Sequence, residues 1–123
     1  MTARAELGHR GEDHTARWLE KNGYRIMERN WHSRWGEIDL IAENGEVLAF
    51  VEVKTRTAGE PGTPEEAVTA VKQQRILKTA EYYLLLHSTV LQPRFDAALL
   101  VVSAEDEPKL AQFRYYKSAF TGE

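Results

Sequence analysis

The sequence predicts an α/β protein with one mixed sheet flanked by two helices, in the order helix, three strands, helix, two strands. Three observations predict this class. A segment with helical spacing comes first, two strand-like segments joined by Asn44-Gly45 follow, and a second helical segment precedes the apolar run 97–102. Helices and strands that each have one apolar face bury those faces by packing in layers.

The N-terminal half contains one expected helix and three expected strands. We expect the helix over 3–22, because Gly23 is the residue type that most often follows a helix C-cap. Strands are expected over 24–31, 36–42 and 46–56. Asn44-Gly45 lies between the last two strands and is a strong signal for a hairpin. A two-residue turn there would place Glu43 opposite Glu46.

The C-terminal half contains the second helix and the last two strands. The segment 58–64 is rich in Gly and Pro and is expected to be a loop. A capping box of Thr63, Pro64 and Glu66 would begin a helix that runs to about Leu86. Strands are expected over 94–102, from its apolar run, and over 110–116.

Composition excludes several classes of function. The 123 residues are expected to form a single domain, 1–123, and contain no cysteine, which excludes disulfides, thiolate metal sites and cysteine nucleophiles. The longest apolar run is far shorter than the ~20 residues of a membrane span, so no membrane partner and a cytoplasmic location are expected. The net charge is −3. Basic residues gather at 17–34 and 72–78, which indicates either a local basic face or ordinary solvated helix faces.

Four charged residues share one face of the expected hairpin. Side chains alternate along a strand, so Glu37, Asp39, Glu52 and Lys54 project together, with Glu37 opposite Glu52 and Asp39 diagonal to it. At about 7 Å and an effective dielectric of about 20, two carboxylates repel by about 2 kcal/mol. Either the face is merely polar, with Lys54 bridging to Glu52, or it holds a cation. The apolar neighbours favour the cation, and oxygen ligands without cysteine suit Mg²⁺ or Mn²⁺.

The first helix adds another acid. Glu12 lies on the same helix face as residues that are small or apolar, and an acid in a packing face should be paired or bound to metal. Two interpretations stay open here. Glu12 either joins the hairpin acids or lies at a helix edge, paired with Arg10 or Arg17.

These residues carry a resemblance. Glu12, then Gly36-Glu37-Ile38-Asp39-Leu40-Ile41, then Phe50-Val51-Glu52-Val53-Lys54-Thr55-Arg56 resemble the PD-(D/E)XK nuclease superfamily, which has the restriction-endonuclease-like fold. The chain most resembles the bacterial YraN-like family, which is related to archaeal Holliday junction resolvases, over Gly8 to about Phe120. Asp39 takes the place of the metal-binding aspartate, although Ile38 stands where the motif has proline. Glu52-Val53-Lys54 takes the place of the E-x-K motif, and Glu12 that of the helix-one glutamate.

The resemblance implies a metal-dependent DNA endonuclease that hydrolyses phosphodiester bonds, on branched or otherwise irregular DNA. Asp39, Glu52 and the backbone carbonyl of Val53 would hold Mg²⁺ or Mn²⁺, with Glu12 completing the shell directly or through water. Lys54 would orient the attacking water or offset charge on the phosphate. The alternative is a non-catalytic nucleic-acid-binding or adaptor module that retains the fold. A homodimer would suit cleavage of both strands, but no interface stripe is evident.

A second group of residues is expected to contact nucleic acid. Trp35 is the best candidate for stacking on a base, whereas Trp18 and Trp31 are expected to pack in or beside the core. Lys72 and Arg75 have the spacing for phosphate contacts, and Gln73 is expected to reach the site. The expected contact residues are Arg34, Trp35, Arg56, Lys72, Gln73 and Arg75. Asp96, on a buried strand, is expected to pair with Arg56 or Arg94.

Overall fold

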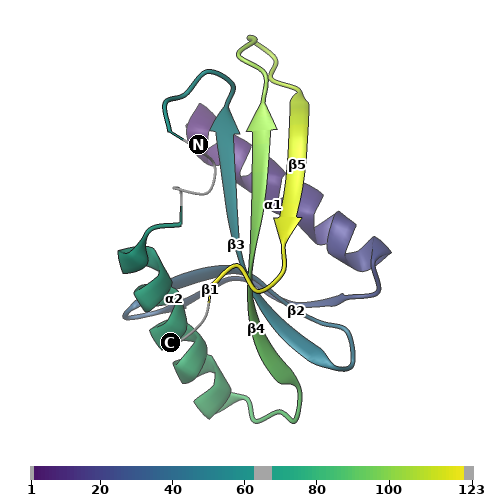
Figure 1. Cartoon of the computed structure of the whole chain (residues 1–123), viewed down its shortest axis with the longest axis vertical. Coiled ribbons are helices and arrows are strands. Elements are labelled where there is room, and N and C mark those ends of the chain that lie inside the picture. Colours follow the sequence, from purple (N-terminus) through teal and green to yellow (C-terminus); the bar gives the residue numbers. More distant parts are fainter. Residues whose placement is uncertain (1, 63–67, 121–123) are drawn as a thin grey trace.

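The computed structural model describes residues 2–62 and 68–120, and its element order is the one that the sequence predicts (Figure 1). One mixed sheet has the strand order β1-β2-β3-β4-β5. Strands β3 and β4 run parallel, and every other neighbouring pair is antiparallel. The elements are α1 (Ala3–Lys21), β1 (Arg25–Ser33), β2 (Gly36–Glu43), β3 (Val47–Thr57), α2 (Ala70–Leu86), β4 (Gln92–Val102) and β5 (Leu110–Tyr116).

Helix α1 begins and ends with side-chain and backbone signals that the sequence contains. Thr2 is the N-cap, and its hydroxyl accepts the N–H of Ala5 at 3.1 Å. At the other end the N–H of Tyr24 donates to the carbonyl of Leu19, and Gly23 has φ +89°. This is the Schellman arrangement, in which a left-handed glycine lets the chain turn back toward the sheet.

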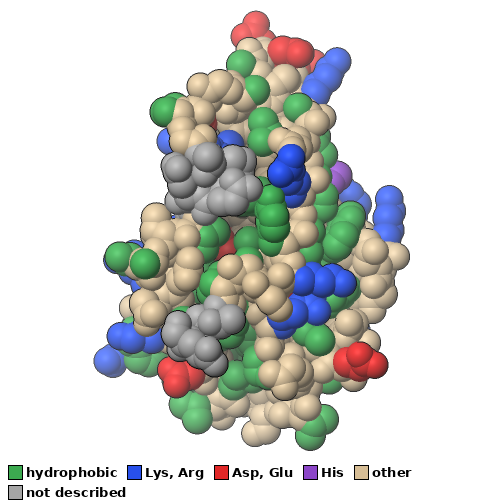
Figure 2. Space-filling model, viewed as in Figure 1, with side chains coloured by type: hydrophobic (Ala, Val, Ile, Leu, Met, Phe, Trp, Pro, Cys, Tyr) green, Lys and Arg blue, Asp and Glu red, His purple; other side chains and the backbone are tan. Residues whose placement is uncertain are grey.

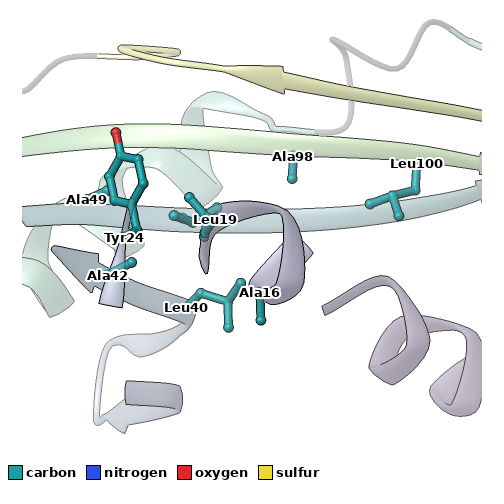
Figure 3. Close-up of a cluster of buried hydrophobic side chains, with 9 residues drawn as sticks. Ala16, Leu19, Tyr24, Leu40, Ala42, Ala49, Ala98 and Leu100 are labelled. Atoms are coloured by element: carbon teal, nitrogen blue, oxygen red, sulfur yellow. The ribbon is translucent and has the colours of Figure 1, made fainter. Parts of the chain in front are cut away.

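The two helices cover opposite faces of the sheet. Ala16 and Leu19 of α1 pack with Leu40, Val51 and Leu100 from three strands; Figure 3 shows this cluster, with Leu19 between the helix and the strands. On the other face the buried members are Ile38, Ile41, Leu48, Phe50, Ile76, Ala80, Tyr83 and Phe120. Among the described residues, neither helix has the length and apolar composition that a membrane crossing requires.

The predicted hairpin register is wrong by two residues. Glu43 pairs with Leu48 rather than with Glu46, and Leu40 pairs with Val51. The connection is longer than two residues because the side-chain oxygen of Asn44 accepts the N–H groups of both Glu46 and Val47. A shift of two leaves the paired residues of these strands on the faces that were predicted, because strand side chains repeat with period two. Beyond the pairing the alternation breaks, because Ile38 and Leu40, two residues apart, pack in cores on opposite faces of the sheet.

The predicted start of the second helix is also wrong. Helix α2 begins at Ala70, and Thr69 is the N-cap whose hydroxyl accepts the N–H of Lys72 at 3.2 Å. Thr69 has extended backbone angles, so a helix continuous from Thr63 does not form. The predicted capping box itself, Thr63, Pro64 and Glu66, lies outside the described residues.

Two glycines in α1 should respond oppositely to alanine. A Cβ at Gly11 would overlap the hydroxyl of Thr55 on β3, whereas a Cβ at Gly8 would meet no atom within 4 Å. We expect Gly8→Ala to stabilise the protein by about 0.5–1 kcal/mol through helix propensity. Gly11→Ala should destabilise it by about 1–3 kcal/mol, because it pushes the helix from the sheet. Thermal melts of both variants test this, and stabilisation by both would contradict the close contact.

Candidate functional site

Asp39 lies where strands β2 and β3 separate. The backbone pairing of these strands ends at Leu40 and Val51. Immediately beyond, the N–H of Val53 donates to Asp39 Oδ2 at 2.8 Å, so the carboxylate fills the gap that opens between the strands. Figure 1 shows β1 and β2 running across the direction of β3 and β4 here. The divergence therefore leaves a carboxylate at a strand junction, where it is only 7% exposed.

Glu12 approaches the same junction from α1. Its side chain is buried, and Asn30 Nδ2 of β1 donates to its Oε1 at 3.1 Å. His9 Nδ1 lies 3.9 Å from the same oxygen. Burial raises the pKa of Glu12, although the Asn30 hydrogen bond opposes that rise. Pairing with Arg10 or Arg17, one of the two sequence-based interpretations, is therefore wrong.

Asn30 is held in an uncommon backbone conformation. It lies between the pairs Arg29–Leu40 and Trp31–Ile38, which places it next to Asp39 on the neighbouring strand. Its φ is +50°, which is rare for residues other than glycine and least costly for asparagine. Strain of this kind concentrates at functional sites.

Glu52 is compensated by a different lysine from the one predicted. Its carboxylate is 8% exposed and accepts from Lys72 Nζ of α2 at 2.9 Å. The bridge to Lys54 that the sequence allowed does not form. Lys54 lies half-buried on β3, two residues from Glu52 and on the same strand face, and it makes no ion pair with any described residue. Its charge acts on Glu60, whose pKa it helps to lower, so Lys54 faces the loop after β3 as well as the strand face of Glu52.

The electrostatics of Asp39 show that the acids converge. Burial and the charge of Glu52 raise the pKa of Asp39 from its ordinary value to about 8, against the Val53 hydrogen bond, and Glu12 and Glu37 add to the rise. Acids from α1, β2 and β3 thus act on one carboxyl group. A buried group that is perturbed by desolvation together with a specific charged neighbour is a candidate functional group.

The donor chemistry of this cluster fits a hard divalent cation. Asp39, Glu52 and Glu12 offer only oxygen, and the Val53 peptide group adjoins Asp39. In the described part of the chain, no three acidic or histidine side chains are as close together as ion binding requires. The Lys72 ammonium lies on Glu52 instead, so a cation would have to displace it and draw the carboxylates inward.

Without metal, Asp39 should weaken the fold as pH rises. Its folded pKa lies above its unfolded value, so folding opposes its ionisation, and stability falls between pH 4 and pH 8. The isosteric variant Asp39→Asn cannot ionise and should be more stable than wild type by about 2 kcal/mol or more at pH 8, but not at pH 4. Urea melts in EDTA at both values test this. An advantage that is equal at both pH values would contradict it.

The residues predicted to contact nucleic acid are not all together. The Arg34 guanidinium lies over the Trp35 ring, 5.0 Å from its centroid, and Arg75 is exposed on α2 beside Gly36. Lys72 lies in the acid cluster. Trp18 and Trp31 pack against other aromatic rings, as predicted.

Two of the predicted contact residues are committed elsewhere. Arg56 binds the carbonyls of Pro61 and Gly62 and pairs with Glu60, so it holds its own loop closed. Gln73 Nε2 donates to the Val68 carbonyl at 3.1 Å, and this contact directs Gln73 to the chain before α2 rather than to the acids.

Sequence reasoning missed Asn30 as a neighbour of the acids and Lys72 as the partner of Glu52. Neither has a spacing that would reveal it, because the contacts span 18 and 20 positions along the chain. Asn30 lies within an expected strand and has no turn signal beside it. The sequence pattern of Lys72 is that of a basic helix face. Only the packing of α2 against the sheet brings Lys72 to Glu52.

Together, fold and site define an α/β protein whose buried carboxylates meet where two strands of a mixed sheet separate. The sequence profile of "Uncharacterised protein family UPF0102" matches residues 11–100, and the chain belongs to this family, as the YraN-like resemblance predicts. A UPF0102 protein of Chlorobium chlorochromatii is 42% identical over 117 residues, which cover 94% of this chain and 91% of the relative. One from Symbiobacterium thermophilum is 50% identical over 103 residues, covering 83% and 84%.

Proposed function

We propose that the protein is a metal-dependent DNA endonuclease of the PD-(D/E)XK type, with the restriction-endonuclease-like fold, that hydrolyses phosphodiester bonds in branched or otherwise irregular DNA. The observation that supports this most is the convergence of buried acids from α1, β2 and β3 on Asp39. These carboxylates repel one another, which destabilises the fold in the absence of metal. A bound divalent cation would neutralise that repulsion and would also act on a phosphate.

Each residue has a role in this proposal. Asp39, Glu52 and the Val53 carbonyl would hold Mg²⁺ or Mn²⁺, with Glu12 joining directly or through water. The ion would polarise the scissile phosphate and lower the pKa of a coordinated water. Lys54, which has no ion-pair partner among the described residues, would orient that water and offset charge on the phosphate. Asn30 would position Glu12 through its hydrogen bond.

The ion pair between Lys72 and Glu52 favours a second candidate function. This ion pair neutralises part of the acid cluster without a metal. A non-catalytic nucleic-acid-binding or adaptor module that retained the fold would need such neutralisation, because it holds no metal ion. The two candidates differ in one property. The nuclease must exchange the Lys72 ammonium for a divalent cation, whereas the binding module keeps it.

Metal binding and cleavage should fail together in the acid variants. Calorimetry with Mn²⁺ should show binding to the wild type, which weakens as pH falls because protonated carboxylates do not bind metal, and no binding to Glu52→Gln. With Mg²⁺, the wild type should cut at least one of duplex, single-stranded, flap or four-way-junction DNA, and Glu52→Gln should not. Glu43→Gln, which removes a carboxylate elsewhere on β2, is the matched control. DNA binding without metal binding or cleavage would favour the binding module.

A further inference from the structure

A groove on the surface of the protein has aromatic and apolar walls. It has a volume of about 650 Å³ and lies between the β1–β2 turn and the C-terminal half of α2. The rings of Trp35 and Tyr82 meet edge to face, with centroids 5.6 Å apart, and Leu85 is 80% exposed. The lining residues are Trp35, Lys78, Glu81, Tyr82, Leu84 and Leu85.

Hydrogen bonds hold the backbone of the β1–β2 turn, which carries Trp35, against α2. The Ser33 hydroxyl lies 3.1 Å from Thr79 Oγ1 of α2, and the same hydroxyl accepts the N–H of Trp35 at 3.1 Å. At Gly36, with φ +152°, a Cβ would lie 3.5 Å from the Cβ of Arg75, so the turn rests directly on the helix. Trp35 is therefore a preorganised platform, which lowers the entropy cost of stacking a ligand on it.

Cations surround this platform and lead from it to the acids. The Arg34 guanidinium covers one part of the Trp35 ring, and Lys78 lines the groove. Lys72, Arg75, Lys78 and Tyr82 recur at spacings of three or four residues, so they follow one side of α2. Figure 2 shows Lys and Arg side chains beside exposed hydrophobic ones at the left margin, over α2. The ten residue steps from Lys72 to Tyr82 rise about 15 Å along the helix axis.

We propose that this groove holds one unpaired nucleobase of the DNA substrate, stacked on Trp35 and against Tyr82, while Arg75 and Lys78 neutralise the phosphates that lead to the acid cluster. The inference rests on the proposed nuclease function and deepens it by naming the substrate class. Aromatic faces stack on any base, and flanking cations pair with its phosphates. Glu81, the acid of the groove, accepts from an exocyclic amino group, which thymine lacks.

The test measures stacking separately from cleavage. A duplex with one bulged 2-aminopurine and a distant fluorescein label, and the fully paired duplex, are titrated in EDTA. We expect quenching of 2-aminopurine by the wild type and loss of that quenching in Trp35→Ala, with affinity for the bulged duplex lowered about tenfold or more. Affinity for the paired duplex should change less than about twofold. Leu86→Ala, at an exposed position of α2 outside the groove, is the matched control, and Trp35→Phe should restore part of the quenching.

Different failures have different meanings in this test. If the wild type binds both duplexes equally without quenching, the groove does not hold a base, although the proposed nuclease function stands. If the wild type binds neither DNA and cuts none with Mg²⁺, both proposals fall. If Trp35→Ala instead dissociates a dimer seen in sedimentation, a second copy of the chain occupies the groove and the inference is overturned.

Discussion

Asp39→Asn should reduce DNA cleavage by at least about 100-fold, because even residues that only orient metal ligands cost 10- to 100-fold when they are removed. The same variant should bind DNA more tightly in EDTA at high pH. With a pKa of about 8 in the absence of metal, Asp39 is largely uncharged at pH 7 and repels a phosphate only at higher pH. Wild-type affinity should therefore fall above pH 8, and the affinity of Asp39→Asn should not.

Lys54→Ala should separate this electrostatic effect from a simple loss of activity. It should also lose cleavage, yet bind DNA in EDTA equally or less well, because it removes a favourable charge. Anisotropy titrations of labelled junction DNA at pH 7 and pH 9 measure both variants. Glu43→Gln is the matched control, since Glu43 lies on the same strand as Asp39 and pairs with Arg25. If Asp39→Asn and Lys54→Ala shift metal-free affinity in the same direction, the proposed arrangement of charges is wrong.

Asp96→Asn should cause the largest loss of stability among single conservative changes. Asp96 is fully buried and accepts two hydrogen bonds from Arg94, at 2.8 and 2.9 Å. It also accepts the Tyr115 hydroxyl at 2.6 Å and the Ser118 N–H at 3.0 Å. Removing one partner of a buried ion pair leaves the other charge uncompensated and costs about 3–5 kcal/mol.

Two further variants make this stability prediction testable even if Asp96→Asn fails to fold. Tyr115→Phe removes one hydrogen bond to the carboxylate and should cost about 1.5–3 kcal/mol. Asp13→Asn breaks the exposed pair between Arg29 and Asp13, in which both side chains are more than 40% exposed, and should cost less than about 1 kcal/mol. Urea denaturation of the three variants ranks them. Equal losses for Asp96→Asn and Asp13→Asn would contradict a structural role for the buried pair.

The order and type of the elements followed from local signals. Gly23 ends α1 because a left-handed residue there closes the helix, and the apolar run 97–102 lies in the buried strand β4. The pairing of Asp96 with Arg94 was one of two expected partners and is confirmed, because the residues lie two apart on one strand face. Such features depend on neighbours in the sequence.

The hairpin shows which features local sequence signals do not predict. Asn44-Gly45 correctly predicts a turn between β2 and β3, but not its length, which the hydrogen bonds of the Asn44 side chain decide. The predicted faces of the paired residues survive because the error is an even number of residues. The start of α2 was missed because Thr63 and Thr69 are both acceptable N-caps, and the choice depends on how the preceding chain is held, for example by Gln73 on Val68.

By itself, the sequence determined the element order, the family, and the placement of Asp39 and Glu52 on the two strands of one hairpin, because strand period and motif spacing are local properties. The tertiary structure decided the compensation of those acids. Lys72 rather than Lys54 pairs with Glu52, and Asn30 rather than an arginine binds Glu12. These partners come from other elements, and the packing of those elements decides which side chain is close enough to bond a buried carboxylate. The free-energy cost of burying a carboxylate depends on whether it has such a partner, and no local sequence pattern encodes a partner on another element.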